Sequence, residues 1–156
     1  MTVIATDGKT IAADGLMTFG YERGANQSEK LSTSHGVVFA TAGVAIHRTI
    51  VNWYAAGADP NNLPRIDGAE KWYLLVIDSE GMRFFSSLIP YPTRTKSPFT
   101  MGQGGEYAMG ALQHGATPEE AVAIAIKMCT GCGGEIQVID IAEALGLDKP
   151  LLEAAE

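Results

Sequence analysis

The sequence is poor in cysteine, in basic residues and in long apolar runs. Its two cysteines, Cys129 and Cys132, are too few and too close together for the disulfide framework of a small secreted domain. Eleven Lys and Arg against 18 Asp and Glu give a net charge of −7 with no basic cluster, which argues against nucleic-acid binding. No apolar stretch reaches the roughly 18 residues of a membrane span, and no basic segment followed by an apolar run opens the chain. We therefore expect a cytoplasmic protein with no nucleic-acid or membrane partner.

The chain is nevertheless rich enough in apolar residues to fold without help. It has 156 residues, about one domain, and 46% of them are hydrophobic. A chain of this size typically buries roughly 68–70% of its unfolded surface, so it can form a core without disulfides or a metal. We expect one domain over residues 1–141 and a helical tail over 142–156, and we expect no cofactor.

The hydrophobic periodicity alternates between two residues, typical of strands, and 3.6 residues, typical of helices. Antiparallel hairpins interrupted by helices do not form a parallel βαβ sheet, so the order predicts a layered α+β domain. The expected elements are a hairpin over 2–13 turning at Asp7-Gly8, a surface loop over 15–28, a hairpin over 29–41, a helix of about four turns with Ile46, Ile50, Trp53 and Gly57 on one face, strands over 72–77 and 82–86, a proline-containing loop to Pro98, a strand over 99–102, helices over 106–114 and 118–128, and a strand over 135–141.

The helix over 118–128 carries the clearest local signal. Thr117 is a good N-cap, Pro118 suits the first helical position, and Glu120 completes a capping box. The helix is apolar nearly all round, which predicts that it is covered on both sides.

Several motifs together resemble the proteasome β-type family of N-terminal nucleophile hydrolases. The opening Met-Thr-Val-Ile is followed by Asp7-Gly8, Ile-Ala-Ala-Asp-Gly-Leu-Met-Thr, Ser-Glu-Lys-Leu and Val-Val-Phe-Ala-Thr-Ala-Gly. The pattern is equally similar to the proteolytic subunit of the bacterial two-component ATP-dependent protease and its phage-encoded relatives. Thr-Met-Gly-Gln-Gly-Gly-Glu-Tyr-Ala from residue 100 and Gly-Gly-Glu-Ile from residue 133 extend the likeness, so it covers roughly residues 2–141. The resemblance implies a four-layer αββα sandwich.

The resemblance also implies a threonine peptidase and assigns roles to five residues. Thr2 would be the nucleophile once Met1 is removed, because its own α-amine, with a pKa of about 7.7–8.0, can act as the base. Lys30 would favour the neutral amine, and Asp14 would hold Lys30 charged and in place. Thr18 corresponds to the substrate-binding strand and Gly43 to the oxyanion-hole N–H. The implied substrate is a peptide or unfolded protein, and the implied assembly is a homo-oligomer, with rings and an ATPase partner left open.

Three positions depart from the family's pattern. Gln103 stands where the family has a Ser, and Cys129 and Cys132 stand where it has an Asp and a Ser before Gly-Gly. Cys129 cannot supply the charge of a carboxylate. The alternative function is therefore a catalytically inactive, proteasome-like assembly or scaffold subunit.

The register of the first hairpin decides which residue lies opposite Asp14. A two-residue loop at Asp7-Gly8 puts Asp14 opposite residue 1, whereas a three-residue loop through Lys9 puts it opposite Thr2. The sequence leaves both registers open.

The Cys129-Thr-Gly-Cys132 spacing is also that of redox pairs and of half a zinc site. Zinc needs about four ligands, and only His35, His47 and His114 are available elsewhere, so we predict no metal site. The pair follows a helix rather than opening one, and we interpret it as small residues in a tight turn. We expect His47 and His114 to be surface or capping residues.

Overall fold

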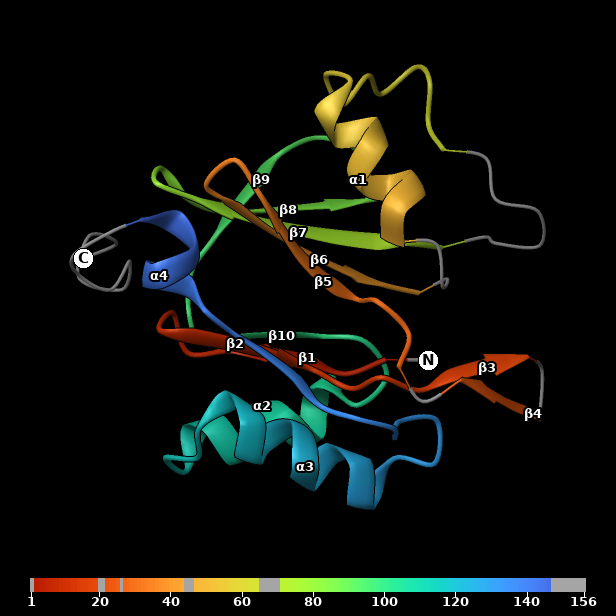
Figure 1. Cartoon of the computed structure of the whole chain (residues 1–156), viewed down its shortest axis with the longest axis vertical. Helices are drawn as coiled ribbons and strands as arrows, with labels where there is room; N and C mark the ends of the chain where they lie inside the picture. The colour runs from red at the N-terminus through yellow and green to blue at the C-terminus, as the bar shows by residue number, and fades with distance from the viewer. Residues whose placement is uncertain (1, 20–21, 26, 44–46, 65–70, 147–156) are drawn as a thin grey trace.

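The computed structural model describes residues 2–19, 22–25, 27–43, 47–64 and 71–146. Two antiparallel sheets lie face to face, with a helix on one outer face and two helices on the other (Figure 1). The predicted four-layer αββα sandwich is therefore confirmed. The helices that cover it are α1 (His47–Ala55) over one sheet, and α2 (Gly105–Gln113) and α3 (Pro118–Met128) over the other.

The first sheet has the strand order β10-β1-β2-β11, with the N-terminal hairpin in its centre. Its strands are β1 (Ile4–Thr6), β2 (Thr10–Ala13), β10 (Phe99–Met101) and β11 (Gln137–Asp140). Pairing of β1 with β2 in the register Thr6 to Ile11 leaves a four-residue loop over 7–10. The Asp7 carboxylate accepts from the N–H groups of Lys9 and Thr10, and Gly8 has φ +89°, so the loop closes on the predicted Asp7-Gly8.

Neither register considered for this hairpin is correct. The side chain and the N–H of Asp14 both bond to the backbone of Val3, so Asp14 lies opposite Val3 rather than opposite residue 1 or Thr2. The longer loop has a physical cause, because the Thr6 hydroxyl bonds to the Gly8 N–H and the Thr10 carbonyl and caps the loop from inside. Thr2 is consequently the residue just before the pair that contains Asp14.

The second sheet has the order β5-β6-β7-β8-β9. Its strands are β5 (Leu31–Ser34), β6 (Val37–Ala42), β7 (Tyr73–Asp78), β8 (Gly81–Ser86) and β9 (Thr93–Thr95). The first four were predicted, and the turn between β5 and β6 contains His35, which has φ +51°. β9 falls in the segment predicted as a loop, where Thr93 pairs with Phe84.

The region predicted as a surface loop over 15–28 also contains strands. There β3 (Met17–Phe19) and β4 (Glu22–Ala25) form a separate two-stranded hairpin that projects from one end of the sandwich (Figure 1). Its glycines and polar residues hid this pairing, since they interrupt any two-residue alternation.

Three apolar clusters hold the layers together. One lies between the sheets and includes Ile4, Leu75 and Ile77. A second joins the first sheet to α2 and α3, and a third joins the second sheet to α1 through an aromatic group that contains Trp53 and Trp72. The central strands β1, β2, β6 and β7 are almost fully buried because both of their faces are covered, whereas the edge strands β9 and β11 are largely exposed.

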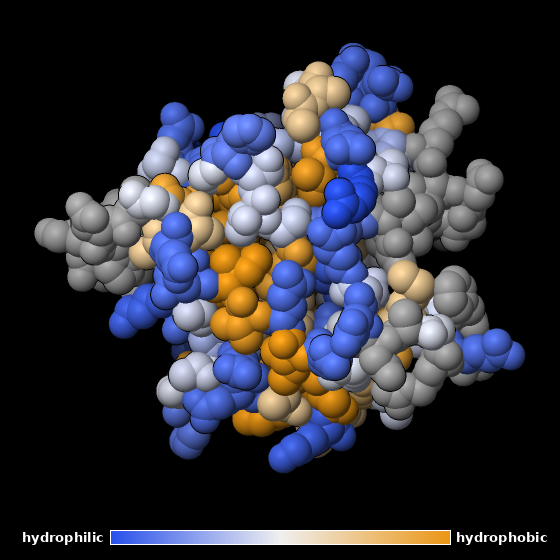
Figure 2. Space-filling model, in the orientation of Figure 1, coloured by the Kyte–Doolittle hydropathy of each residue, from blue (hydrophilic) through white to orange (hydrophobic). Residues whose placement is uncertain are grey.

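Helix α3 is covered on one side only, so the prediction of burial on both sides is wrong for the single chain. Ala121, Val122 and Ala125 pack on the first sheet, but Ile124 is 41% and Met128 is 59% exposed. Figure 2 shows apolar side chains reaching the surface over this helical layer.

The carboxyl-terminal part begins with a short helix, α4 (Ile141–Leu145). Ile141 is fully buried in the cluster between the sheets, so this helix starts inside the predicted domain, and Gly146 ends it in a left-handed conformation. The remainder of the predicted tail, 147–156, lies outside the described residues. None of the helices in the described segments has the length and apolar character that a membrane crossing requires.

The capping box predicted for α3 is confirmed. The Thr117 hydroxyl accepts from the Glu120 N–H, and the Glu120 carboxylate accepts from the Thr117 N–H.

Replacing Thr117 by Ala removes a hydroxyl acceptor that satisfies one free N–H of the first turn. We expect a loss of about 1 kcal/mol in the free energy of unfolding, measured by urea denaturation. Thr117→Ser keeps the acceptor and should remain close to wild type. Equal midpoints for the Ala variant and wild type would contradict the role of the cap.

Candidate active site

A buried ion pair forms the centre of the site. Lys30, directly before β5, places its Nζ 2.8 Å from Oδ1 of Asp14, directly after β2, so the pair joins the two sheets. The Asp14 side chain is fully buried and the Lys30 side chain is 7% exposed. Lys30 also donates to the Leu16 carbonyl at 2.8 Å. Removing one partner of such a pair costs about 3–5 kcal/mol, because the other charge stays buried.

The Asp14 carboxylate is also held by two backbone N–H groups. Oδ1 accepts from Val3 N–H and Oδ2 from Gly133 N–H, both at 3.0 Å. The Gly133 carbonyl in turn accepts from the N–H groups of Gly15 and Leu16, the two residues after Asp14. One carboxylate therefore ties together the first strand, the start of β5 and the turn before β11.

Thr2 is buried next to this pair, at 5% exposure. Its neighbour Val3 bonds to Asp14, and its own carbonyl accepts from Gly104 N–H at 3.2 Å. Thr2 is thus adjacent in sequence to Val3, which bonds to the Asp14–Lys30 pair.

The glycines after β10 allow this close approach to Thr2. Gly102 has φ +90°, and a Cβ there would lie 2.2 Å from the Thr2 carbonyl oxygen. A Cβ on Gly104 would lie 2.8 Å from Val3 Cβ and 2.9 Å from Cys132 Sγ. Sequence reasoning recognised this motif but not its steric purpose, which is to let a turn lie directly on the Thr2 backbone.

The remaining predicted residues lie around this cluster. Gly43 follows β6, has φ +106°, and approaches the Lys71 carbonyl so closely that a Cβ would lie 2.5 Å from it. Thr18 lies in β3, at an irregularity in its pairing with β4. Gln103 is exposed between the two close-packed glycines. The described contacts do not connect Gly43 or Thr18 directly to Thr2.

Cys129 and Cys132 are both buried and free. Burial, a hydrogen bond with Cys129 and the nearby Asp14 carboxylate raise the pKa of Cys132 to about 12, against a smaller opposing effect of Lys30. Cys132 therefore lies close enough to Asp14 and Lys30 for their charges to act on its thiol, and Cys129 contacts Cys132. No three His, Cys, Asp or Glu side chains gather in a metal-binding arrangement within the described ranges.

His47 is buried, so its prediction as a surface or capping residue is wrong. Its ring bonds to two hydroxyls, Nε2 to Ser32 at 2.6 Å and Nδ1 to Thr41 at 2.8 Å. The Thr41 N–H bonds in turn to the Lys30 carbonyl, so His47 anchors α1 to the strands beside the ion pair. Burial lowers the pKa of His47, Arg48 lowers it further, and Glu29 opposes both. The helical period places residue 47 off the apolar stripe, and only the facing hydroxyls explain its burial.

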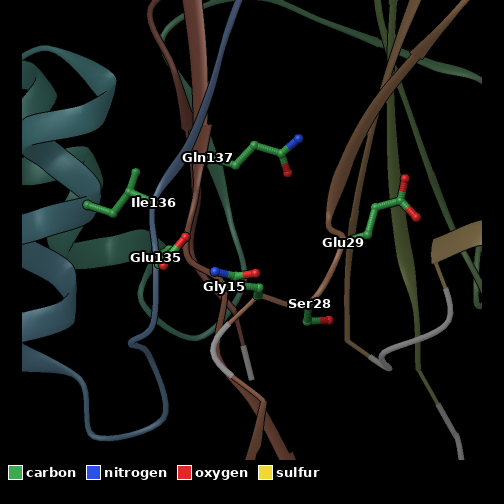
Figure 3. Close-up of a pocket in the computed structure, with 7 residues that line it drawn as sticks. Gly15, Ser28, Glu29, Glu135, Ile136 and Gln137 are labelled. Carbon is green, nitrogen blue, oxygen red and sulfur yellow. The ribbon is translucent and has the colours of Figure 1, made fainter.

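A polar cavity of about 390 Å³ opens beside the site. Gly15, next to Asp14, lines it together with Ser28 and Glu29 on one side and Glu135 and Gln137 on the other (Figure 3). Gln137 points across toward β5 and donates to the Leu31 carbonyl at 3.2 Å. Solvent-accessible space therefore begins one residue from the buried carboxylate.

Solved structures with the same fold cover almost the whole chain. The BPH protein of Thiobacillus denitrificans in complex with epoxomicin is 18% identical, with a TM-score of 0.68 over 90% of this chain and 99% of that one. BPH alone gives 19% identity and a TM-score of 0.65 over 90% and 98%. Eukaryotic HslV from Trypanosoma brucei gives 15% and 0.62 over 88% and 97%.

Comparisons of the sequence alone find no match, neither with a protein-family model nor with a curated protein. The likeness therefore concerns the fold, a layered α+β sandwich that this chain shares with these BPH and HslV chains. It confirms the fold that the resemblance implied.

The close approach at Gly102 can be tested by Gly102→Ala. Gly36 offers a matched control, since it also has a positive φ of +72° but would place a Cβ with nothing within 4 Å. Both Ala variants carry left-handed strain, and only Gly102→Ala adds the collision with Thr2. We expect it to lose about 1–3 kcal/mol more unfolding free energy than Gly36→Ala in urea denaturation. Equal losses would show that the turn does not press on Thr2.

The lowered pKa of His47 predicts a pH-dependent stability. In the unfolded chain the pKa is about 6.5, so below that pH the unfolded state binds more protons and stability falls as the pH decreases. We expect the urea midpoint to drop between pH 7.5 and 5.5, with a smaller drop in His47→Gln.

The exposed His114 supplies the control for this measurement. His114→Gln should keep the wild-type pH dependence, because that ring is at the surface. An unchanged slope in His47→Gln would exclude His47 as its source.

Proposed function

We propose that the protein is a threonine peptidase that cleaves peptide bonds with Thr2 as nucleophile after removal of Met1. The observation that supports this most strongly is the buried Lys30–Asp14 pair, bonded to the residue after Thr2 and covered by a turn that holds the Thr2 carbonyl. The HslV and BPH chains have the same fold as this chain, and this shared fold also supports a peptidase.

In this proposal the α-amine of Thr2 takes the proton from its own hydroxyl. The oxygen then attacks the peptide carbonyl carbon, and the electrons of the C=O bond move onto the carbonyl oxygen. The Gly43 N–H stabilises that oxyanion. The amine returns the proton to the leaving nitrogen as the C–N bond breaks, and water later hydrolyses the resulting ester by the same route.

Lys30 and Asp14 act on the state of this amine. The Lys30 ammonium disfavours a second positive charge nearby, so it favours the neutral, basic form of the amine, and it attracts the developing alkoxide. Asp14 keeps Lys30 charged and fixed by their 2.8 Å contact. The buried position of the pair strengthens both effects, because water screens them little.

Substrate and assembly follow from the same proposal. An extended peptide or unfolded protein would pair with the backbone at Thr18. A homo-oligomer would cover the apolar side chains that α2 and α3 leave exposed, among them Tyr107 at 44% and Met128 at 59%. Rings and an ATPase partner fit this proposal. The two free thiols support a reducing compartment, and we propose the cytoplasm.

A second candidate is a catalytically inactive subunit on the same fold. It is favoured by the buried, uncharged Cys129 and Cys132, which stand where the family pattern has an Asp and a Ser. In this candidate the uncharged Cys129 gives the site less polar support than the carboxylate of the family pattern would.

The first test combines intact mass with turnover of protein expressed without an amino-terminal tag. We expect wild type to lack Met1, to hydrolyse unstructured peptides and to gain the mass of one epoxomicin molecule. Thr2→Ala should abolish both hydrolysis and labelling, whereas Thr2→Ser keeps a hydroxyl and should retain measurable turnover.

Lysine variants provide the matched control. Lys30→Met removes the buried ammonium and should reduce kcat by at least about 10²-fold, whereas the exposed Lys127→Met should not change it. A folded protein that keeps Met1, shows no turnover and takes no label would overturn the peptidase proposal and favour the inactive subunit.

A further inference from the structure

The buried cysteine pair has no role in the proposed reaction. Cys129 follows α3 directly, and Cys132 precedes Gly133, the residue that holds Asp14. Both thiols are at most 7% exposed and lie in the cluster between α3 and the first sheet. Two buried nucleophilic groups thus meet directly behind the ion pair.

The backbone brings the two residues to disulfide distance. Cys132 N–H donates to the Cys129 carbonyl at 3.1 Å, which closes a four-residue turn. Such a turn holds its end Cα atoms within about 7 Å, and disulfides span Cα separations of about 4.4–6.8 Å. A hydrogen bond with the Cys129 side chain is one cause of the raised pKa of Cys132, so the two side chains approach each other. A bond between them needs little movement of the backbone.

The surroundings discriminate among the chemistries open to such a pair. Metal binding requires thiolates, but burial and Asp14 hold Cys132 in its neutral form, with a pKa of about 12. Deprotonating the two thiols to bind a metal would add negative charge beside the Asp14 carboxylate, whose single charge Lys30 already neutralises. A disulfide is uncharged, as the two thiols are, so its formation buries no new charge.

We propose that Cys129 and Cys132 are a reversible oxidation site that forms a turn-closing disulfide with a low-molecular-weight disulfide as oxidant. Cys129 gives up its proton to water as its sulfur attacks a sulfur of the oxidant, and one small thiolate leaves, while Cys132, whose pKa is raised, stays a neutral thiol in this step. The other cysteine then attacks the mixed disulfide and releases the second. Two electrons pass to the oxidant, and the two protons of the pair go to the released thiols. The inference does not rest on the proposed peptidase activity.

The disulfide would act on the site through two contacts. A disulfide would bring the two sulfurs to about 2.05 Å from each other, so the Cys132 sulfur would move. That sulfur packs closely on Gly104, since a Cβ added to Gly104 would lie 2.9 Å from it. Gly104 N–H holds the Thr2 carbonyl, and Gly133, next to Cys132, holds Asp14. The oxidation state of the pair therefore bears on the positions of both Thr2 and Asp14.

The test measures the thiols of the folded protein directly. Native protein is incubated with excess oxidised glutathione at pH 8, quenched in acid, alkylated with N-ethylmaleimide in denaturant and weighed. We expect the untreated protein to take two maleimides. The oxidised protein should take none and should have lost only the mass of two hydrogen atoms, and dithiothreitol should restore both labels.

Single variants and a catalytic variant complete the design. Cys129→Ser and Cys132→Ser cannot form the bond, so each should carry at most one glutathione. Thr2→Ala should oxidise like wild type, so a failed peptidase assay leaves this result unaffected. The proposal would be overturned if folded protein treated with oxidised glutathione still took two maleimides under conditions in which the urea-unfolded chain becomes oxidised. A glutathione adduct that persists in place of the internal bond would also overturn it.

Discussion

The architecture of the site depends on the Asp14 carboxylate. Its two oxygens accept from Lys30, Val3 and Gly133, which belong to three segments far apart in the sequence. An ionised carboxylate buried without such partners would cost several kcal/mol, so folding must bring all three segments together. The electrostatic centre of the site is thus also the junction of the two sheets.

The layers could largely be predicted from the sequence, because the strongest local patterns agree with the tertiary structure. The run before Asp78 is a buried strand, and the capping box at Thr117 starts α3. Where the local sequence pattern is weak, the predicted secondary structure was wrong. The β3–β4 hairpin is rich in glycine and polar residues, and β9 lies among prolines, so only pairing with neighbouring strands defines them.

The ion pair itself was predictable from the family resemblance, whereas the contacts around it were not. The register opposite Asp14 depends on the Thr6 hydroxyl, which lengthens the loop by bonds that no alternation of residues reveals. The burial of His47 depends on Ser32 and Thr41, two strand residues that are distant in sequence. Contacts of this kind are invisible to helical periodicity because they involve a second element.

The bond between Gly133 and Asp14 spans 119 residues, and this separation orders events during protein synthesis. The ribosome delivers Thr2, Asp14 and Lys30 first, and Gly133, which completes the hydrogen bonds of the carboxylate, only 119 residues after Asp14. Long-range contacts of this kind form late, because the intervening chain must be closed first. A nascent chain therefore carries every charged residue of the site before it can hold them in their final geometry. Asp14 acquires its last partner only when the turn before β11 has been synthesised.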